Sequence, residues 1–153
     1  MDIFDQIPNS LQEAIDLLLT LKDAEEVANS YAAPIDFMSM CHQGIGRTIR
    51  NEWNLWKGCN ACPVAEAPLY YWFYNRGLSH PDDISGCILK AVWCEVKGVE
   101  FDLAAKIKQY QTYWEVCWDT EWRSVNKVVE NVIAKYEAPK LEHSYNVKWP
   151  NSK

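Results

Sequence analysis

The 153-residue sequence has no long apolar run and no leader-like beginning. No stretch approaches the ~20 apolar residues that a membrane-spanning helix needs. The segment from Met1 to Asp5 lacks the basic region and apolar run of a secretory leader. We therefore expect neither membrane insertion nor export. The six cysteines fall largely inside helical patterns, which favours reduced thiols in the cytoplasm over a disulfide framework.

The signatures of common catalytic and metal sites are also missing. Cys59 and Cys62 form a pair, but no second pair follows at zinc-ribbon spacing, so Cys41 and His42 would have to complete a tetrahedral site. A Walker-type phosphate loop is excluded, because its Lys-Ser/Thr pair is absent. Ser85 lacks the context of a nucleophile elbow. The sequence thus predicts no catalytic residue and no cofactor, and leaves metal binding by the cysteine pair open.

Composition favours one folded domain, and the charged residues are distributed unevenly along the chain. Hydrophobic residues make up 48% and charged residues 24%, as in ordinary globular proteins. Eight Trp and eight Tyr fit either a core filled by large rings or a binding surface. Residues 1–40 hold eight acidic residues against Lys22, whereas residues 41–76 hold four basic residues against two acidic ones. The acidic part is either simply solvated or meets a basic partner, and direct nucleic-acid binding is disfavoured.

Helix signals recur through the first hundred residues. Ser10 to Glu13 has the spacing of a capping box, and apolar residues follow at helical intervals, so a first helix should run to about Lys22. Pro34 suits the first turn of a later helix, and Gly98 suits a helix end. Further helices are expected at about 24–31, 34 to 44 or 46, 47–56, 69–76 and 81–97, with a loop over 57–68. No strand and no internal repeat is predicted.

A longer helix is expected at the C-terminal end. From Asp102 to Tyr136 there is neither Gly nor Pro, and apolar residues recur every three or four positions. One helix of ~50 Å fits this pattern, as do two helices broken near Asp119. It can pack across the short helices or form a homodimer. The predicted fold class is all-α: a single helical domain over 1–138, built as a compact bundle of short helices with one long or once-broken helix over 102–136, followed by an extended tail over 139–153.

A polar set around two glycines is the main candidate site. Gly44 and Gly46 permit a tight turn between two helices. Arg47 and Arg50 lie three residues apart on one helical face, where they could hold a phosphate or a carboxylate. In the structural alternative, the glycines end one helix and the arginines pair with acids. The whole candidate set comprises His42, Gly44, Gly46, Arg47, Arg50, Asn51, Trp53, Trp56, His80, Asp82 and Asp83.

The segment from His80 to Asp83 allows three interpretations. Its imidazole and two carboxylates could bind a metal ion or act as acid and base. Alternatively, His80 caps a helix and both acids meet the positive helix end. In the third interpretation, Asp82 or Asp83 accepts a bidentate hydrogen bond from Arg50 and so fixes the glycine corner to the later helix.

Two motifs resemble those of a known domain family. The first runs from His42 to Trp56 (H-x-G-x-G-x-x-I-R-N-x-W-x-L-W), and the second from Gly77 to Ser85 (G-L-x-H-P-D-D-I-S). They are similar to the Gly-Leu-Gly-x-Trp-Ile-Arg-Asn-x-Trp and His-Pro-Asp-Asp-Met-Ser segments of an uncharacterised small domain family of bacteria, their phages and mobile elements. The resemblance covers roughly residues 8–97, and Ile45, Thr48 and Ile84 depart from it. It implies a phage or mobile-element setting and a site at the motifs, without a reaction.

Two functional hypotheses follow. The first is a non-enzymatic regulatory protein that binds and inhibits a host protein, such as a defence or nucleic-acid enzyme. Its candidate partner-binding residues are Asp16, Asp23, Glu25, Glu26, Trp114, Trp118 and Trp122. The second is a nucleotide-binding sponge or a metal-dependent hydrolase, with a site built on His42, Arg50, His80 and Asp83.

Overall fold

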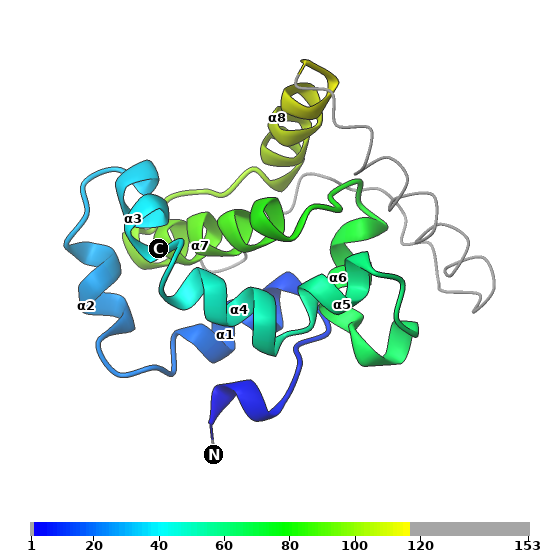
Figure 1. The fold of residues 1–153 in the computed structure, drawn as a ribbon. Coiled ribbons are helices and arrows are strands. Elements are labelled where there is room, and N and C mark those ends of the chain that lie inside the picture. Colours follow the sequence, from blue (N-terminus) through cyan, green and yellow to red (C-terminus); the bar gives the residue numbers. More distant parts are fainter. Residues whose placement is uncertain (1, 117–153) are drawn as a thin grey trace.

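The computed structural model describes residues 2–116, and in this range every regular element is helical (Figure 1). The predicted all-α class is therefore confirmed. Among these residues, no helix combines the length and the apolar character needed to cross a bilayer. Trp118, Trp122, the expected continuation of the last helix to 136 and the tail over 139–153 lie outside the described residues.

Helices make up most of the described chain. The α-helices are α1 (Leu11–Leu18), α2 (Ala24–Asn29), α3 (Pro34–Cys41), α4 (Ile45–Glu52), α5 (Leu55–Cys59), α6 (Pro68–Tyr74), α7 (Pro81–Lys97) and α8 (Leu103–Val116). Two 3-10 helices, η1 (Ile3–Asp5) and η2 (Val64–Glu66), precede α1 and α6.

The helix α7 is the centre of the bundle. It contacts each of the other described α-helices, and Figure 1 shows it crossing the middle of the bundle, with α2 and α3 at one end and α5 and α6 at the other. Eleven of its 17 residues are buried, and a helix that is apolar on most sides belongs in a core. The other helices therefore cover α7, and their relative positions depend on it.

Both ends of α7 follow the sequence signals. Pro81 occupies the first turn, and the His80 side chain caps the helix by accepting a hydrogen bond from the Asp82 backbone N–H at 3.1 Å. Gly98 ends the helix with φ = 67°, in the left-handed region that glycine adopts without steric cost. The expected helix over 81–97 and its cap are confirmed.

Several expected helix boundaries are wrong; the helix expected to reach Gly44 or Gly46 ends at Cys41. The first helix ends at Leu18, before a tight turn at whose end Asp23 has φ = 69°. The expected helix over 47–56 is two helices, because Asn54 takes φ = 57° between α4 and α5. That break separates the two tryptophans that a continuous helix would place on one side: Trp53 is 0% exposed and Trp56 is 38% exposed. Residues 57–68, expected as a loop, contain the end of α5 and the helix η2.

Aromatic rings fill part of the core. Trp53, Tyr70, Tyr71, Phe73 and Phe101 are among the largest fully buried side chains. The two tyrosines still satisfy their hydroxyl groups, which donate to the backbone carbonyls of Ser79 and Cys62 at 2.9 and 2.6 Å. For these residues, the core-filling interpretation of the aromatic content is correct.

Candidate functional site

The glycine corner joins the end of α3 to the start of α4. Gly44 is the residue before α4, and Gly46 lies in its first turn. A Cβ atom at Gly46 would lie 3.0 Å from the Cys41 carbonyl oxygen and 3.3 Å from Nη1 of Arg50. These distances are tighter than ordinary Cβ contacts, so a side chain here would push against the Cys41 backbone and the Arg50 side chain. Glycine at this position therefore lets the Arg50 side chain pass against the backbone.

The Arg50 guanidinium is buried and bound on three sides. Its Nε lies 3.3 Å from Oδ1 of Asp82, its Nη1 donates to Oγ of Ser85 at 2.9 Å, and its Nη2 donates to the His42 carbonyl oxygen at 3.0 Å. Ser85 in turn donates to the Asp82 carbonyl oxygen at 3.0 Å. One side chain thus ties the end of α3 and the helix α4 to the first turn of α7.

The link between the two motifs is therefore present, with Asp82 as the ion-pair partner of Arg50. The recorded contact runs from Nε to one carboxylate oxygen and is not bidentate. Burial lowers the pKa of the Arg50 guanidinium, and the nearby Asp82 carboxylate opposes this effect. Because the guanidinium points at groups of its own chain, the corner is first of all a structural joint.

The other members of the first motif do not gather into a pocket. Arg47 and Asn51 are exposed on α4. Trp53 is buried against Phe4, with ring centroids 5.4 Å apart. Trp56 reaches the second motif, because its ring lies edge-on to His80 with centroids 6.0 Å apart. Sequence reasoning missed Ser85 as a member of the set, although its place three residues after Asp82 puts both on one face of α7.

A second polar cluster lies where α7 meets α8. The His80 ring stacks on Trp114, with centroids 5.1 Å apart and planes 16° apart. The indole Nε1 of Trp114 donates to Oδ2 of Asp83 at 2.6 Å. A cavity of about 380 Å³ opens beside this cluster. Its lining residues are His80, Asp82, Asp83, Lys106, Gln109, Tyr110, Tyr113 and Trp114.

Only two of the four residues of the small-molecule hypothesis line this cavity. His80 and Asp83 line it, whereas neither His42 nor Arg50 does. Burial raises the pKa of the Asp83 carboxyl to about 6, and the hydrogen bond from Trp114 partly opposes that shift. The surroundings of Asp83 thus disfavour its charged form.

The cysteine pair does not join the other potential ligands. Cys59 and Cys62 lie at and after the end of α5, and their thiols contact the carbonyl oxygens of Trp56 and Pro63. Within residues 2–116, no group of three or more His, Cys, Asp or Glu side chains is placed to hold a metal ion. The tetrahedral site that Cys41 and His42 would complete is therefore not formed.

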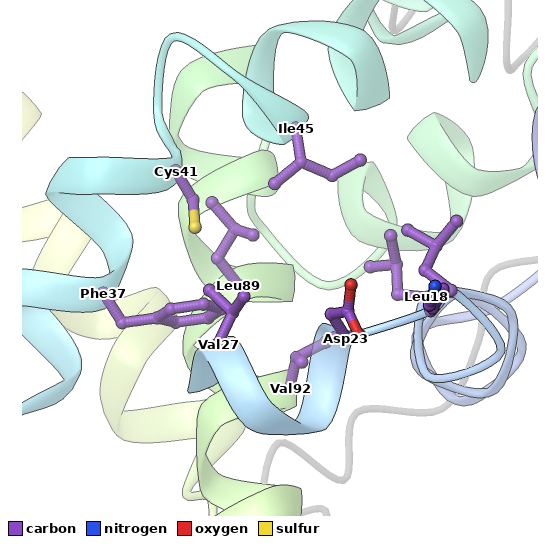
Figure 2. A pocket seen from close by; sticks show the side chains of 11 residues that line it. Leu18, Asp23, Val27, Phe37, Cys41, Ile45, Leu89 and Val92 are labelled. Carbon is purple, nitrogen blue, oxygen red and sulfur yellow. The ribbon is translucent and has the colours of Figure 1, made fainter. Parts of the chain in front are cut away.

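A separate, apolar pocket opens between the helices α1 to α4 and α7. Its cavity measures about 180 Å³. Figure 2 shows the Cys41 thiol and the Asp23 carboxylate among aliphatic side chains. The lining residues are Leu18, Leu21, Lys22, Asp23, Ala24, Val27, Phe37, Cys41, Ile45, Leu89 and Val92. No sequence motif marks this pocket, because its walls come from five helices and one turn.

The candidate partner-binding residues fall into two groups. Asp16, Asp23, Glu25 and Glu26 are exposed, and Asp23 lies at the apolar pocket. Trp114 is half-buried, and its ring and Nε1 are engaged by His80 and Asp83. The acidic residues are therefore presented to solvent, whereas Trp114 holds α8 to the start of α7.

Comparison with known proteins identifies the family of this chain. The model of a domain of unknown function (DUF6794) matches residues 7–96. The chain belongs to this family. The match agrees with the resemblance over roughly residues 8–97, and it ends within α7. The DUF6794 region thus holds the Arg50 corner and the apolar pocket and stops before α8. Comparison with curated proteins and with solved structures finds no match.

The contacts of Arg50 predict a loss of stability on its substitution, even when the new side chain keeps the positive charge. In the DUF6794 region, Arg50→Ala leaves Ser85, Asp82 and the His42 carbonyl without their donor, so we expect a loss of about 3 kcal/mol of unfolding free energy. Arg50→Lys should still lose about 2 kcal/mol, because one ammonium cannot reach all three acceptors. Urea unfolding measures both values. The exposed Arg47→Lys control should change stability by less than about 0.5 kcal/mol. A comparably small change in Arg50→Lys would contradict the joint.

The Asp83 carboxyl predicts a pH dependence of stability. Its pKa is about 6 when folded, against ~3.9 for a free aspartate. Between these values the folded state binds a proton that the unfolded chain releases, so stability falls as pH rises from 4 to 6 and then levels off. This group should contribute a decrease of about 2 kcal/mol between pH 4.5 and pH 7.

Asp83→Asn should remove that contribution, because its amide oxygen still accepts from Trp114 and carries no charge. Urea unfolding of the wild type and the variant at both pH values gives the difference. The exposed Asp36→Asn, also in a first helical turn, is the matched control. Equal pH slopes in the wild type and Asp83→Asn would overturn this account.

Proposed function

We propose that this protein is a non-enzymatic binding protein that engages and inhibits a partner protein through its acidic N-terminal face. We define this face as the surface around Asp16, Asp23, Glu25 and Glu26. The supporting observation is their arrangement: these carboxylates are exposed, and one of them lies at an open apolar pocket. In contrast, the Arg50 guanidinium is bound within the fold.

The charge of this face indicates the kind of partner. Residues 16–36 carry five acidic side chains against Lys22. Such a surface attracts a basic one and accelerates the encounter. Enzymes that act on nucleic acids carry basic surfaces for phosphate groups. An acidic protein can compete for them, which fits a cytoplasmic inhibitor of a host defence or nucleic-acid enzyme in a phage or mobile-element setting.

The cysteines also support a binding role. Burial raises the pKa of Cys59 to about 11, and it raises the pKa values of Cys41, Cys62 and Cys94 as well. These thiols therefore stay protonated at neutral pH, whereas nucleophilic catalysis needs the thiolate. The protonated thiols, together with an Arg50 guanidinium that is bound to groups of its own chain, favour recognition over catalysis.

Charge reversal on α2 tests the proposal. Partner proteins captured from host lysate by the wild type should have basic surfaces and should bind Glu25→Lys/Glu26→Lys at least about tenfold more weakly, because attraction becomes repulsion. Affinity is measured with the purified partner. The control Glu52→Lys/Glu115→Lys makes the same charge change at exposed positions on α4 and α8. Equal affinity of both double variants would refute binding through the acidic face.

The cavity between α7 and α8 supports a second candidate function, binding of a nucleotide. Its volume of about 380 Å³ lies in the range of small-molecule sites. The Tyr113 ring is 55% exposed and can stack on a base, the Lys106 ammonium can meet a phosphate, and Asp82 can accept from ribose hydroxyls.

Thermal shift with ATP, GTP and their monophosphates tests this candidate. A bound nucleotide at saturating concentration should raise Tm by about 2 °C or more. Lys106→Gln should abolish the shift, whereas Lys57→Gln, an exposed lysine outside the cavity, should preserve it. A flat melting temperature across all nucleotides would remove this candidate.

A further inference from the structure

The apolar pocket has the size of one side chain. Its cavity of about 180 Å³ is close to an engineered protein cavity of ~150 Å³ that binds benzene. Leu18, Val27, Phe37, Leu89 and Val92 supply apolar walls (Figure 2). A hole of this size and chemistry suits a phenyl ring or a branched aliphatic group.

Asp23 adds a charge at this pocket under backbone strain. It precedes α2 with φ = 69°, a conformation that costs non-glycine residues roughly 1–2 kcal/mol. An aspartate before a helix usually caps it, yet the Asp23 side chain makes no capping hydrogen bond. No capping hydrogen bond therefore holds this carboxylate to the backbone of α2.

More acidic side chains follow Asp23 on α2. Glu25 and Glu26 are exposed, and they lie between two residues that line the pocket, Ala24 and Val27. Val27 itself is 44% exposed. Lys22 is the single basic residue of the lining. An apolar hole next to several carboxylates is complementary to a segment that is basic and carries an apolar side chain.

We propose that this pocket receives one aromatic or branched aliphatic side chain from a basic segment of the partner protein, whose Lys or Arg residues pair with Asp23, Glu25 and Glu26. This inference rests on the proposed binding function and names the partner's recognition element. The inserted side chain supplies the buried centre of the interface, and the charges around it supply orientation and rate.

A peptide selection on the full-length protein tests the inference. A random peptide library is panned against the immobilised wild type, and the enriched peptides are measured individually by fluorescence anisotropy. We expect peptides with an aromatic or branched aliphatic residue flanked by Lys or Arg. Replacement of that residue by Ser should weaken binding at least about tenfold, the loss expected for a central apolar anchor. No enrichment, or enrichment of acidic peptides, would overturn the inference.

Two matched pairs of protein variants locate the binding. Val27→Trp places a large ring at the pocket and should weaken peptide binding at least about tenfold, whereas Val99→Trp, at a valine of similar exposure (46% against 44%), should not. Asp23→Asn keeps a residue type that tolerates positive φ and removes the charge. It should weaken binding about threefold or more, whereas Asp36→Asn should not. Circular dichroism and Tm confirm that all four variants fold.

The outcomes separate this inference from the function on which it rests. If Glu25→Lys/Glu26→Lys loses the peptides and Val27→Trp keeps them, the acidic face binds and the pocket inference is wrong. If neither variant loses them, both proposals fail. A selected sequence that matches residues 139–153 would make this chain's own tail the occupant, and a dimer abolished by Val27→Trp would make a second copy the occupant. Either result would overturn a partner segment as the ligand.

Discussion

The buried guanidinium of Arg50 is the interaction on which the arrangement of the helices depends. A charge is retained in a protein interior only when its donors are matched by acceptors, because its desolvation is costly. Here the acceptors come from Asp82, Ser85 and the His42 carbonyl, residues far apart in the sequence. Gly46 provides the space, and His80 sets the start of α7 at the right place. The two motifs are therefore parts of one joint.

This joint also positions the walls of the apolar pocket. It fixes the corner between α3 and α4 against α7, and those three helices supply Phe37, Cys41, Ile45, Leu89 and Val92 to the apolar pocket. On the other side of Asp82, the same first turn of α7 presents Asp83 to Trp114. The polar residues of the joint thus position the walls of an apolar pocket, and the exposed carboxylates of α2 lie on a helix that lines it.

The sequence predicts those features that depend on neighbours along the chain. Helical periodicity, a proline at the first turn and a terminal glycine are enough to place α7, and the acid–base pairing of the motifs leads to the Arg50–Asp82 contact. The breaks at Asp23 and Asn54 escape prediction, because their positive φ values balance a local cost against packing gained elsewhere. Ser85 is missed because its role as a hydrogen-bond acceptor depends on Arg50, which lies 35 positions away in the sequence. The apolar pocket has no local signal at all, because it exists only where five helices meet.

The position of α7 gives the bundle a mechanical property as well. Because every other described α-helix contacts α7, loss of α7 would expose apolar surface on all of them. Unfolding of the region should then be all-or-none, with amide protons of α7 exchanging only through global opening. The short α2 takes part in the same arrangement: the Lys97 ammonium of α7 donates to the Asn29 carbonyl oxygen of α2 at 2.8 Å, so the helix that carries Glu25 and Glu26 is fixed to the centre of the bundle.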